Sequence, residues 1–170
     1  MSADLPNQLP TDDEDFKDFV EGLNYTMFLV TTTDGTRRDG CLVGFTTQTS
    51  IDPIQFLVCL SRNNMTTRIA ARNHYVAVHQ IGPDQKPLAR LFGEESGEWT
   101  DKLAQCAWSD GPHGVPVLDG VPAWFVARIE DILDLGDHAG LLVAPVAAAG
   151  TRVPGLTFTD LRDLEPGQTA

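Results

Sequence analysis

The sequence is poor in cysteine and in basic residues, and it has no long hydrophobic run. Its 170 residues include 3 cysteines, and 12 lysines and arginines stand against 24 acids, a net charge of −12. Such a shortage of positive charge argues against binding to nucleic acid or to an anionic membrane surface. No apolar stretch approaches the roughly 20 residues of a membrane span, and the acidic start of the chain is unlike a signal peptide. We therefore expect a soluble, cytoplasmic protein.

Several catalytic signatures are also missing. The chain has no GxGxxG motif, P-loop, GxSxG nucleophile elbow or CxxC pair. Cys41, Cys59 and Cys106 are widely spaced in or beside apolar stretches, a pattern typical of small buried residues rather than of a disulfide framework. The 4 histidines are scattered, so we predict no metal site and expect surface or hydrogen-bonded structural histidines.

The acidic residues are unevenly distributed along the chain. Residues 1–24 and 90–170 carry the excess of acids, whereas residues 25–89 hold slightly more basic than acidic residues. Chance among a few surface residues explains this difference. An anionic small ligand held by the middle third explains it equally well, and both explanations stay open at this point.

The chain is expected to form a single domain. Residues 1–10 contain two prolines and no periodic pattern, which predicts a flexible N-terminal arm. The domain is expected over residues 11–149. Residues 150–170 are predicted to be a C-terminal tail with one anchoring patch at Leu156 and Phe158.

An amphipathic helix is predicted over residues 12–22. Thr11 and Glu14 have the spacing of a capping box, and acidic residues in the first turn suit the helix dipole. Apolar residues then recur at helical spacing, and they are Phe16, Phe19, Val20 and Leu23.

Segments rich in β-branched and aromatic residues predict a mainly β fold. Asp34-Gly35 and Gly136-Asp137-His138 are hairpin turn signals that favour antiparallel strands in a β-barrel with accessory helices. The alternative is a parallel sheet in which a helix connects two of these segments as a βαβ crossover. The expected strands are residues 25–33, 40–47, 54–60, 75–81, 123–135 and 139–146, with 54–60 and 75–81 as the alternative crossover pair.

The connections between strands hold the accessory helices. Asn63-Asn64 is expected to cap a short helix, and residues 85–92 and 98–107 are predicted to form two more. Residues 111–122 are rich in glycine and proline, which predicts a turn-rich surface segment with one short strand.

A polar tract interrupts the β region. Gly40 and Gly44 precede it and allow a ligand to approach the backbone closely. The next residues offer hydroxyl and amide groups for hydrogen bonds, although a solvated strand end would have the same composition. They are Thr46, Thr47, Gln48, Thr49 and Ser50.

Two further polar features follow. Ser61 to Arg68 comes after the next strand and opens a helix, where hydroxyls, backbone N–H groups and arginines suit a phosphate. An ordinary Asn-capped helix is the alternative. His138 lies in a turn between two strands, a position that meets a ligand in a barrel mouth, although a turn histidine needs no function.

Taken in order, these segments resemble the flavin reductase-like family of FMN-binding proteins from about Tyr25 to Val146. The resemblance implies a split β-barrel with Greek-key antiparallel strands. The motifs that carry it are the hydroxyl-rich run before Ser50-Ile51-Asp52-Pro53, then Phe56-Leu57-Val58-Cys59-Leu60-Ser61-Arg62, Leu88-Ala89-Arg90-Leu91-Phe92-Gly93, Val115-Pro116-Val117-Leu118-Asp119-Gly120 and Gly136-Asp137-His138.

The resemblance also implies where a flavin binds. The isoalloxazine ring would lie against Gly44 to Thr47, and the ribityl chain and phosphate would lie at Gln48 to Ser50 and at Arg62 to Thr67. His138 matches the histidine of the family's GDH motif and is the catalytic candidate. The cofactor-binding candidates are Gly44, Phe45, Thr46, Thr47, Gln48, Thr49, Ser50, Ser61, Arg62, Asn63, Thr66 and Thr67.

The activity implied by the resemblance is hydride transfer from NADH or NADPH to FMN, with FAD as the alternative flavin. It further implies a homodimer with flavin near the subunit interface and a partner monooxygenase that receives reduced flavin. Two alternatives stay open. One is an FMN-binding electron-transfer or sensor protein without reductase turnover, and the other is deazaflavin-dependent chemistry on a similar barrel.

Overall fold

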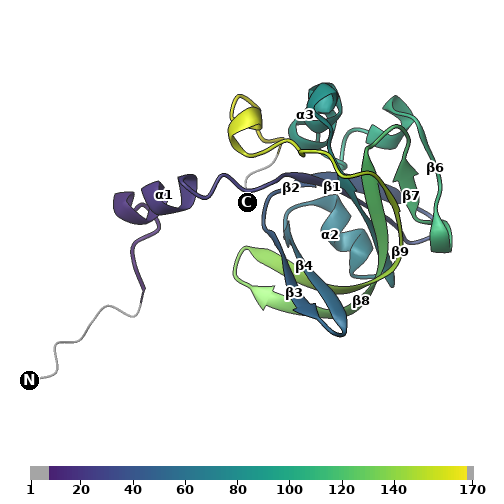
Figure 1. Ribbon diagram of the computed structural model, residues 1–170, viewed down its shortest axis with the longest axis horizontal. Helices are drawn as coiled ribbons and strands as arrows, with labels where there is room; N and C mark the ends of the chain where they lie inside the picture. Colours follow the sequence, from purple (N-terminus) through teal and green to yellow (C-terminus); the bar gives the residue numbers. More distant parts are fainter. Residues whose placement is uncertain (1–7, 168–170) are drawn as a thin grey trace, which may run out of the picture.

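A seven-stranded antiparallel sheet dominates the computed structural model, which describes residues 8–167 (Figure 1). The strand order in the sheet is β2-β1-β5-β8-β9-β4-β3. The strands are β1 (Phe28–Thr33), β2 (Arg38–Val43), β3 (Thr46–Ile51), β4 (Ile54–Ser61), β5 (Tyr75–Gln80), β8 (Ala123–Leu135) and β9 (His138–Gly150), and a separate small sheet pairs β6 (Trp108–Asp110) with β7 (Pro116–Leu118).

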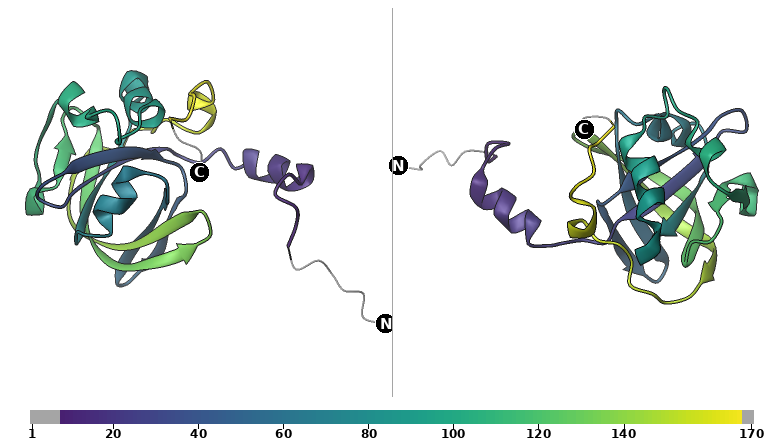
Figure 2. Two further views of the ribbon diagram at one scale, coloured as in Figure 1. Left: turned by 180° about the vertical axis from the view of Figure 1, so that it is seen from behind. Right: turned by 90° about the horizontal axis from the view of Figure 1, so that it is seen from above.

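The predicted mainly β, antiparallel fold class is confirmed. The alternative βαβ crossover is wrong, because β8 and β9 lie between β4 and β5 in the sheet. Strands β2 and β3 occupy opposite edges of the sheet, yet only Gly44 and Phe45 separate them along the chain. The sheet therefore curls so that the end of β2 lies close to the start of β3, and α2 (Met65–Ala70) lies inside the curl (Figures 1 and 2).

The remaining helices are short and lie at the margins. They are α1 (Glu14–Glu21), α3 (Lys86–Glu94) and the 3-10 turns η1 (Pro83–Gln85), η2 (Lys102–Gln105), η3 (Pro112–Gly114) and η4 (Thr159–Leu161). None of the helices described between residues 8 and 167 has the length and apolar composition to cross a membrane.

Four local predictions require correction. The cap of α1 is Asp13 rather than Thr11, since the Asp13 carboxylate accepts the Phe16 N–H at 2.9 Å. The expected helix over 98–107 is reduced to η2, which Asp101 caps before the chain extends into β6. The expected strand over 40–47 breaks at Gly44, and the strand within residues 111–122, β7, is buried rather than superficial.

Among the described residues three apolar clusters form the core, and the smallest packs β7 against β5 and β8. One fills the inside of the curled sheet against α2, and its residues include Val30, Val58, Leu60, Val76 and Leu141. Another packs the outer face of β1 against α3 and the C-terminal segment, and it includes Leu29, Ile81, Phe92, Leu156 and Leu161. The predicted anchoring of the tail through Leu156 and Phe158 is confirmed.

An ion pair is buried between these elements. Lys102 Nζ lies 3.2 Å from Asp39 Oδ1, and both side chains are almost inaccessible to water. The Thr66 hydroxyl donates to the other Asp39 oxygen at 2.8 Å. This cluster ties η2 and α2 to β2. The predicted division into arm, domain and tail stays a prediction, and residues 1–7 and 168–170 lie outside the described residues.

Candidate functional site

A pocket of about 210 Å³ opens where β2 gives way to β3. Its walls come from six parts of the chain: the segment before β1, the end of β2 with the bend that follows it, β4, the N-terminal cap of α2, the start of β9 and the C-terminal segment. The side chains that define it are Tyr25, Phe45, Cys59, Ser61, His138 and Phe158.

Gly44 makes the bend at this pocket. A Cβ at Gly44 would lie 2.5 Å from the Tyr25 ring and 2.9 Å from the Met27 sulfur, so no side chain fits there. The bend turns Phe45 outward, where 49% of it is exposed. The Phe45 ring contacts the His138 ring at a centroid distance of 5.1 Å and the Tyr25 ring at 5.8 Å. An aromatic wall therefore flanks the histidine.

His138 is the first residue of β9, directly opposite Ser61 in β4. Its Nδ1 lies 2.6 Å from the Asp137 carboxylate. The hydrogen bond and the charge of His138 hold the pKa of Asp137 below its usual range. The Asp137 carboxylate therefore fixes the orientation of the imidazole, which lies beside the Phe45 ring.

Arg62 holds the turn that carries His138. Its Nε donates to the Gly136 carbonyl at 2.8 Å, its Nη2 lies 2.5 Å from the Asp134 carboxylate, and its backbone N–H donates to the Asp137 carbonyl at 3.0 Å. Three contacts to one hairpin turn fix the position of that turn against the end of β4. The structure thus gives Arg62 a positioning role, and phosphate binding by Arg62 stays a prediction.

The predicted polar tract forms β3, an edge strand. Thr47, Gln48 and Thr49 are exposed, and the Gln48 amide donates to the Ser50 carbonyl at 3.1 Å across a bulge. The tract begins beside the pocket at Thr46 and runs away from it along the edge. The hydroxyl groups of the tract face solvent. A ligand too large for the pocket would extend along them.

The helix-opening segment divides into two parts. Ser61 lines the pocket and Asn63 is exposed. Thr66 is buried with its hydroxyl on Asp39, and the Thr67 hydroxyl donates to the Ser61 carbonyl at 2.5 Å. Thr66 and Thr67 therefore have hydrogen-bond acceptors within the protein, whereas the side chains of Ser61 and Asn63 lie closer to solvent.

Sequence reasoning missed six residues that line the pocket, whereas Asn64 lies within the Arg62 to Thr67 segment that the resemblance marks. The missed residues are Tyr25, Met27, Leu42, Val43, Cys59 and Phe158. Tyr25 and Phe158 lie at opposite ends of the chain, but their rings are 5.4 Å apart and the neighbouring Thr26 and Thr157 form a β-bridge. The aromatic character of Tyr25 and Phe158 was the sequence signal that could have marked them as pocket residues. Burial raises the pKa of the Tyr25 phenol and of the Cys59 thiol, so both stay neutral near pH 7.

Comparison with known proteins identifies the class. Residues 20–159 match the family model described as the flavin reductase like domain. The chain belongs to this family, and the resemblance seen in the sequence is confirmed.

Individual relatives agree with this class. The chain is 31% identical to the FMN reductase (NADH) RutF of Bradyrhizobium diazoefficiens over 79% of this chain and 74% of that protein. It is 30% identical to the reductase component of the flavin-dependent trigonelline monooxygenase of Acinetobacter baylyi over 66% of this chain, but it spans only 37% of that protein. A crystal structure of the FMN-binding protein from Thermus thermophilus with bound p-hydroxybenzaldehyde superposes with a TM-score of 0.70 at 25% identity, covering 74% of this chain and 71% of that one.

Proposed function

We propose that this protein is a flavin reductase that transfers a hydride from NADH or NADPH to FMN, with FAD as the alternative flavin. The observation that carries the proposal is the pocket at Gly44, where the Phe45 ring lies against the His138–Asp137 pair. The family match supports the flavin, and the name of the Bradyrhizobium relative supports NADH as the donor.

The residues of the pocket fit a flavin. Tyr25, Phe45 and Phe158 offer aromatic surface to a planar ring, and Ser61 and Asn64 supply polar groups at its margin. None of the described residues that line the pocket is acidic, although the chain carries a net charge of −12. An anionic ligand in the pocket would therefore meet no carboxylate in the described lining, which supports the ligand explanation for the charge pattern of the middle third.

A second copy of the chain is proposed to complete the site. Small-molecule sites usually measure about 300–1,000 Å³, and this pocket measures about 210 Å³. One chain thus encloses only part of a flavin. Large apolar side chains are also exposed on the β3–β4 turn and the β8–β9 hairpin, and they include Ile51, Ile54, Ile132, Leu133 and Leu135. A homodimer would cover such a surface.

The chain's own residues are proposed to bind and orient rather than to transfer protons. Flavin, when bound, supplies the hydride-accepting chemistry. The His138 imidazole, held by Asp137, offsets negative charge at the reacting centre and positions the nicotinamide nucleotide. Phe45 excludes water from the same place. The assignments of Gly44 to Ser50 and of Ser61 to Thr67 as flavin contacts stay part of this proposal.

Two features of context complete the proposal. The Acinetobacter relative is named as the reductase component of a monooxygenase, so reduced flavin from this protein is proposed to feed a partner monooxygenase. Cys41, Cys59 and Cys106 are free thiols, which suits the reducing cytoplasm.

The test is His138→Ala, with His74→Ala as the matched control because His74 is exposed and lies outside the pocket. We expect kcat/KM for NADH to fall by roughly 10–100-fold in His138→Ala, as for loss of a positioned charged group. The dissociation constant of FMN, measured by flavin fluorescence, should change little, and His74→Ala should match the wild type.

Three outcomes would contradict parts of the proposal. Equal losses of FMN binding and NADH oxidation in His138→Ala would contradict the assigned role of His138. Firm FMN binding without NADH or NADPH oxidation in the wild type would favour the electron-transfer or sensor alternative. A colourless protein that binds no flavin and oxidises neither nucleotide would contradict the proposed function.

A further inference from the structure

Helix α1 presents an apolar face that nothing in its own chain covers. Phe16, Phe19 and Leu23 are 56%, 67% and 58% exposed, and the two phenylalanine rings lie together at a centroid distance of 6.4 Å. Within this described helix no residue is buried. Figures 1 and 2 show α1 standing away from the curled sheet in every view.

A helix of this length needs a packing partner. Isolated helices shorter than about 12–15 residues are marginal in water, and α1 has 8 residues. Its cap and its 3.7 Å Lys17–Glu14 contact contribute only modestly. The exposed phenylalanines are the one large source of stabilisation that the helix has available.

The link from α1 to the body is short, and its far end is fixed. The Asn24 side chain accepts the Thr159 N–H at 2.9 Å, and the Phe158 N–H donates to the Tyr25 carbonyl at 2.9 Å. The chain is therefore fixed to the C-terminal segment from Asn24 onward. Only Gly22 and Leu23 separate this point from the last residue of α1.

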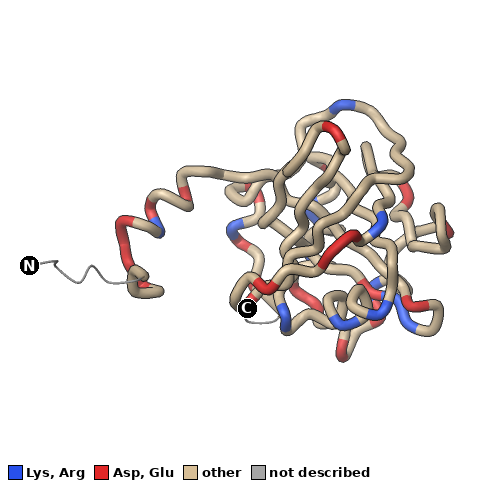
Figure 3. The backbone as a smooth tube through the Cα atoms, turned by 90° about the horizontal axis from the view of Figure 1, so that it is seen from below, with Lys and Arg blue, Asp and Glu red and all other residues tan. Residues whose placement is uncertain are grey.

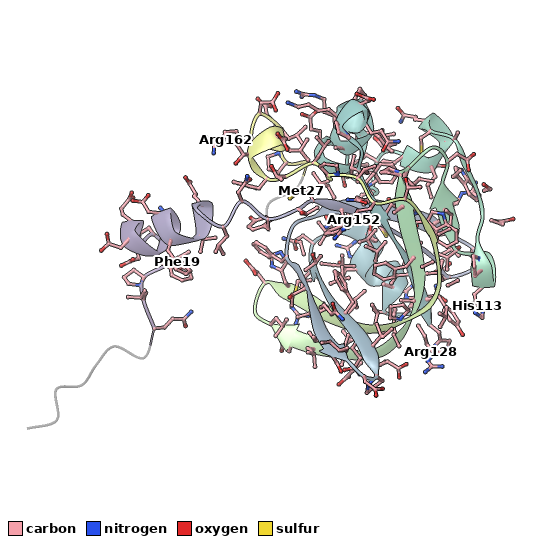
Figure 4. The ribbon with its side chains drawn as sticks, in the orientation of Figure 1. Phe19, Met27, His113, Arg128, Arg152 and Arg162 are labelled. Carbon is pink, nitrogen blue, oxygen red and sulfur yellow. The ribbon has the colours of Figure 1, made fainter. Side chains whose placement is uncertain are left out.

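An apolar groove of about 360 Å³ lies on the body beside this attachment point. It runs between α3 and the C-terminal segment, and its apolar lining comes from Met27, Leu42, Phe158, Leu161 and Leu164. Among the described residues that line the groove, Arg162 alone is charged. Figure 4 shows Arg162 on the C-terminal turn, Met27 at the base of the arm and Phe19 on the detached helix.

We propose that α1 of one chain docks its Phe16–Phe19–Leu23 face into the groove of a second copy, and that the two copies exchange these helices about a two-fold axis. An apolar face and an apolar groove that one chain leaves uncovered are self-complementary when two copies are related by a two-fold axis. The proposal rests on the homodimer proposed above and adds a contact surface to it.

Charge favours contact between α1 and the cation that lines the groove. Helix α1 is acidic, with Glu14, Asp15, Asp18 and Glu21 against Lys17 (Figure 3). Arg162 offers the groove a cation for which the described residues provide no ion-pair partner.

The area is sufficient for an interface. An aromatic side chain buries about 150–250 Å². Each of the two helices contributes two phenylalanines and covers a matching area of the groove. Together these surfaces bury roughly 1,000 Å², which is the lower limit for a specific interface. The groove also shares Met27, Leu42 and Phe158 with the flavin pocket, so the docked helix would support a wall of that pocket.

The test is a disulfide cross-link between two differently tagged chains, one carrying Phe19→Cys and the other Leu164→Cys. We expect oxidation of the mixture to give a covalent heterodimer on a non-reducing gel. Glu21→Cys lies on the opposite face of α1 and is the matched control, so its mixture with Leu164→Cys should give little product. Mixtures with the wild type control for the native thiols.

A second variant avoids engineered thiols. Phe16→Ser with Phe19→Ser changes only exposed side chains, so the body should fold as before, with an unchanged near-ultraviolet spectrum. Sedimentation equilibrium should show the dimer dissociation constant raised at least about tenfold, as expected for loss of central aromatic contacts. Arg162→Glu should weaken the dimer in the same direction.

Several results would overturn the docking. The first is equal cross-linking of Leu164→Cys by Phe19→Cys and by Glu21→Cys. The second is an intrachain disulfide in a single chain that carries both Phe19→Cys and Leu164→Cys. The third is stronger cross-linking of Phe19→Cys to Leu135→Cys than to Leu164→Cys. A dimer that survives the double serine variant unchanged would overturn the docking and leave the homodimer standing. A wild type that is monomeric at all concentrations would instead refute the homodimer itself.

Discussion

At the scale of single residues, His79 shows how a histidine can be structural. It is wholly buried in β5. Its Nδ1 lies 2.9 Å from the Leu29 carbonyl, and its Nε2 accepts the Leu118 N–H at 3.1 Å. This pairing defines the neutral tautomer with the proton on Nδ1. The expectation of a hydrogen-bonded structural histidine is confirmed for this residue, which ties β1 and β7 to β5.

The burial of His79 predicts a dependence of stability on pH. Desolvation lowers the pKa of His79 from 6.5 to about 4, only partly opposed by the hydrogen bond to Leu29. Between these values the unfolded chain binds a proton that the folded chain does not, so the free energy of unfolding falls as pH falls from about 6.5 to about 4. A difference of this size corresponds to roughly 3 kcal/mol.

Urea denaturation at a series of pH values measures this effect. His79→Gln removes the titrating group, so its stability, although lower throughout, should lose less between pH 7 and pH 4.5 than that of the wild type. His74→Ala serves as the control because His74 is exposed, and it should keep the full dependence. Identical pH profiles for the wild type and His79→Gln would refute the assignment.

At the scale of elements, strands were easier to predict than the places where they end. Residues 123–135 have the same limits in the sequence prediction and in β8, because alternating apolar residues and a glycine turn mark them clearly. The break at Gly44 was missed because its cause is steric. Only the folded chain brings the Tyr25 ring and the Met27 sulfur against that position.

The pocket was predictable only in part for the same reason. Gly44, Phe45, Ser61 and His138 lie on strand ends that the family resemblance marks, and the structure brings them together. Phe158 lies in a segment without periodicity. Its place in the pocket depends on the bridge between Thr26 and Thr157, a long-range pairing that no local pattern encodes.

The C-terminal segment is therefore an element to test. The Met27 N–H donates to the Leu156 carbonyl at 2.8 Å, and Leu156 and Leu161 are buried. A chain that ends at Gly150 loses both leucines from the core, and we expect it to be less stable by about 3–6 kcal/mol on the basis of 1.5–3 kcal/mol per side chain. Urea denaturation measures the loss.

A point variant separates stability from binding in this segment. Phe158→Ala keeps both leucines, so it should weaken FMN binding in a fluorescence titration while most of the stability remains. If a chain ending at Gly150 had wild-type stability, the segment would be dispensable for the core. If Phe158→Ala bound FMN normally, the C-terminal segment would form no part of the flavin site.

At the scale of the whole molecule, acidity and ligand binding are compatible because they occupy different places. The acids gather on α1 and in the C-terminal half of the chain, as Figure 3 shows for α1. The described lining of the pocket has none. A net charge of −12 keeps molecules apart in solution, yet it leaves a local site open to a phosphorylated ligand.

Binding at the proposed dimer site predicts linked thermal stability. FMN at about 100 times its dissociation constant adds about 2.7 kcal/mol to the free energy of unfolding, which raises Tm by about 5–10 °C for a chain of this size. Tm should also rise with protein concentration, because unfolding separates the copies. Riboflavin, which lacks the phosphate, is the control and should raise Tm less.

Differential scanning fluorimetry with intrinsic tryptophan emission measures both dependences. A Tm that responds to FMN but not to protein concentration would argue for a monomeric flavin site. Equal shifts with FMN and riboflavin would show that the phosphate lies outside the protein, and the phosphate contacts proposed on β3 and at Arg62 would then be abandoned.

The composition of β3 also bears on aggregation. An edge strand exposes unpaired backbone groups that can recruit a strand from another molecule. From Thr46 to Ser50 this edge carries only hydroxyl and amide side chains, and a bulge between Gln48 and Ser50 interrupts its pairing with β4. A bulge twists an edge strand away from a straight pairing partner. The bulge in the tract proposed to hold a ligand therefore also disfavours edge-to-edge association with another molecule.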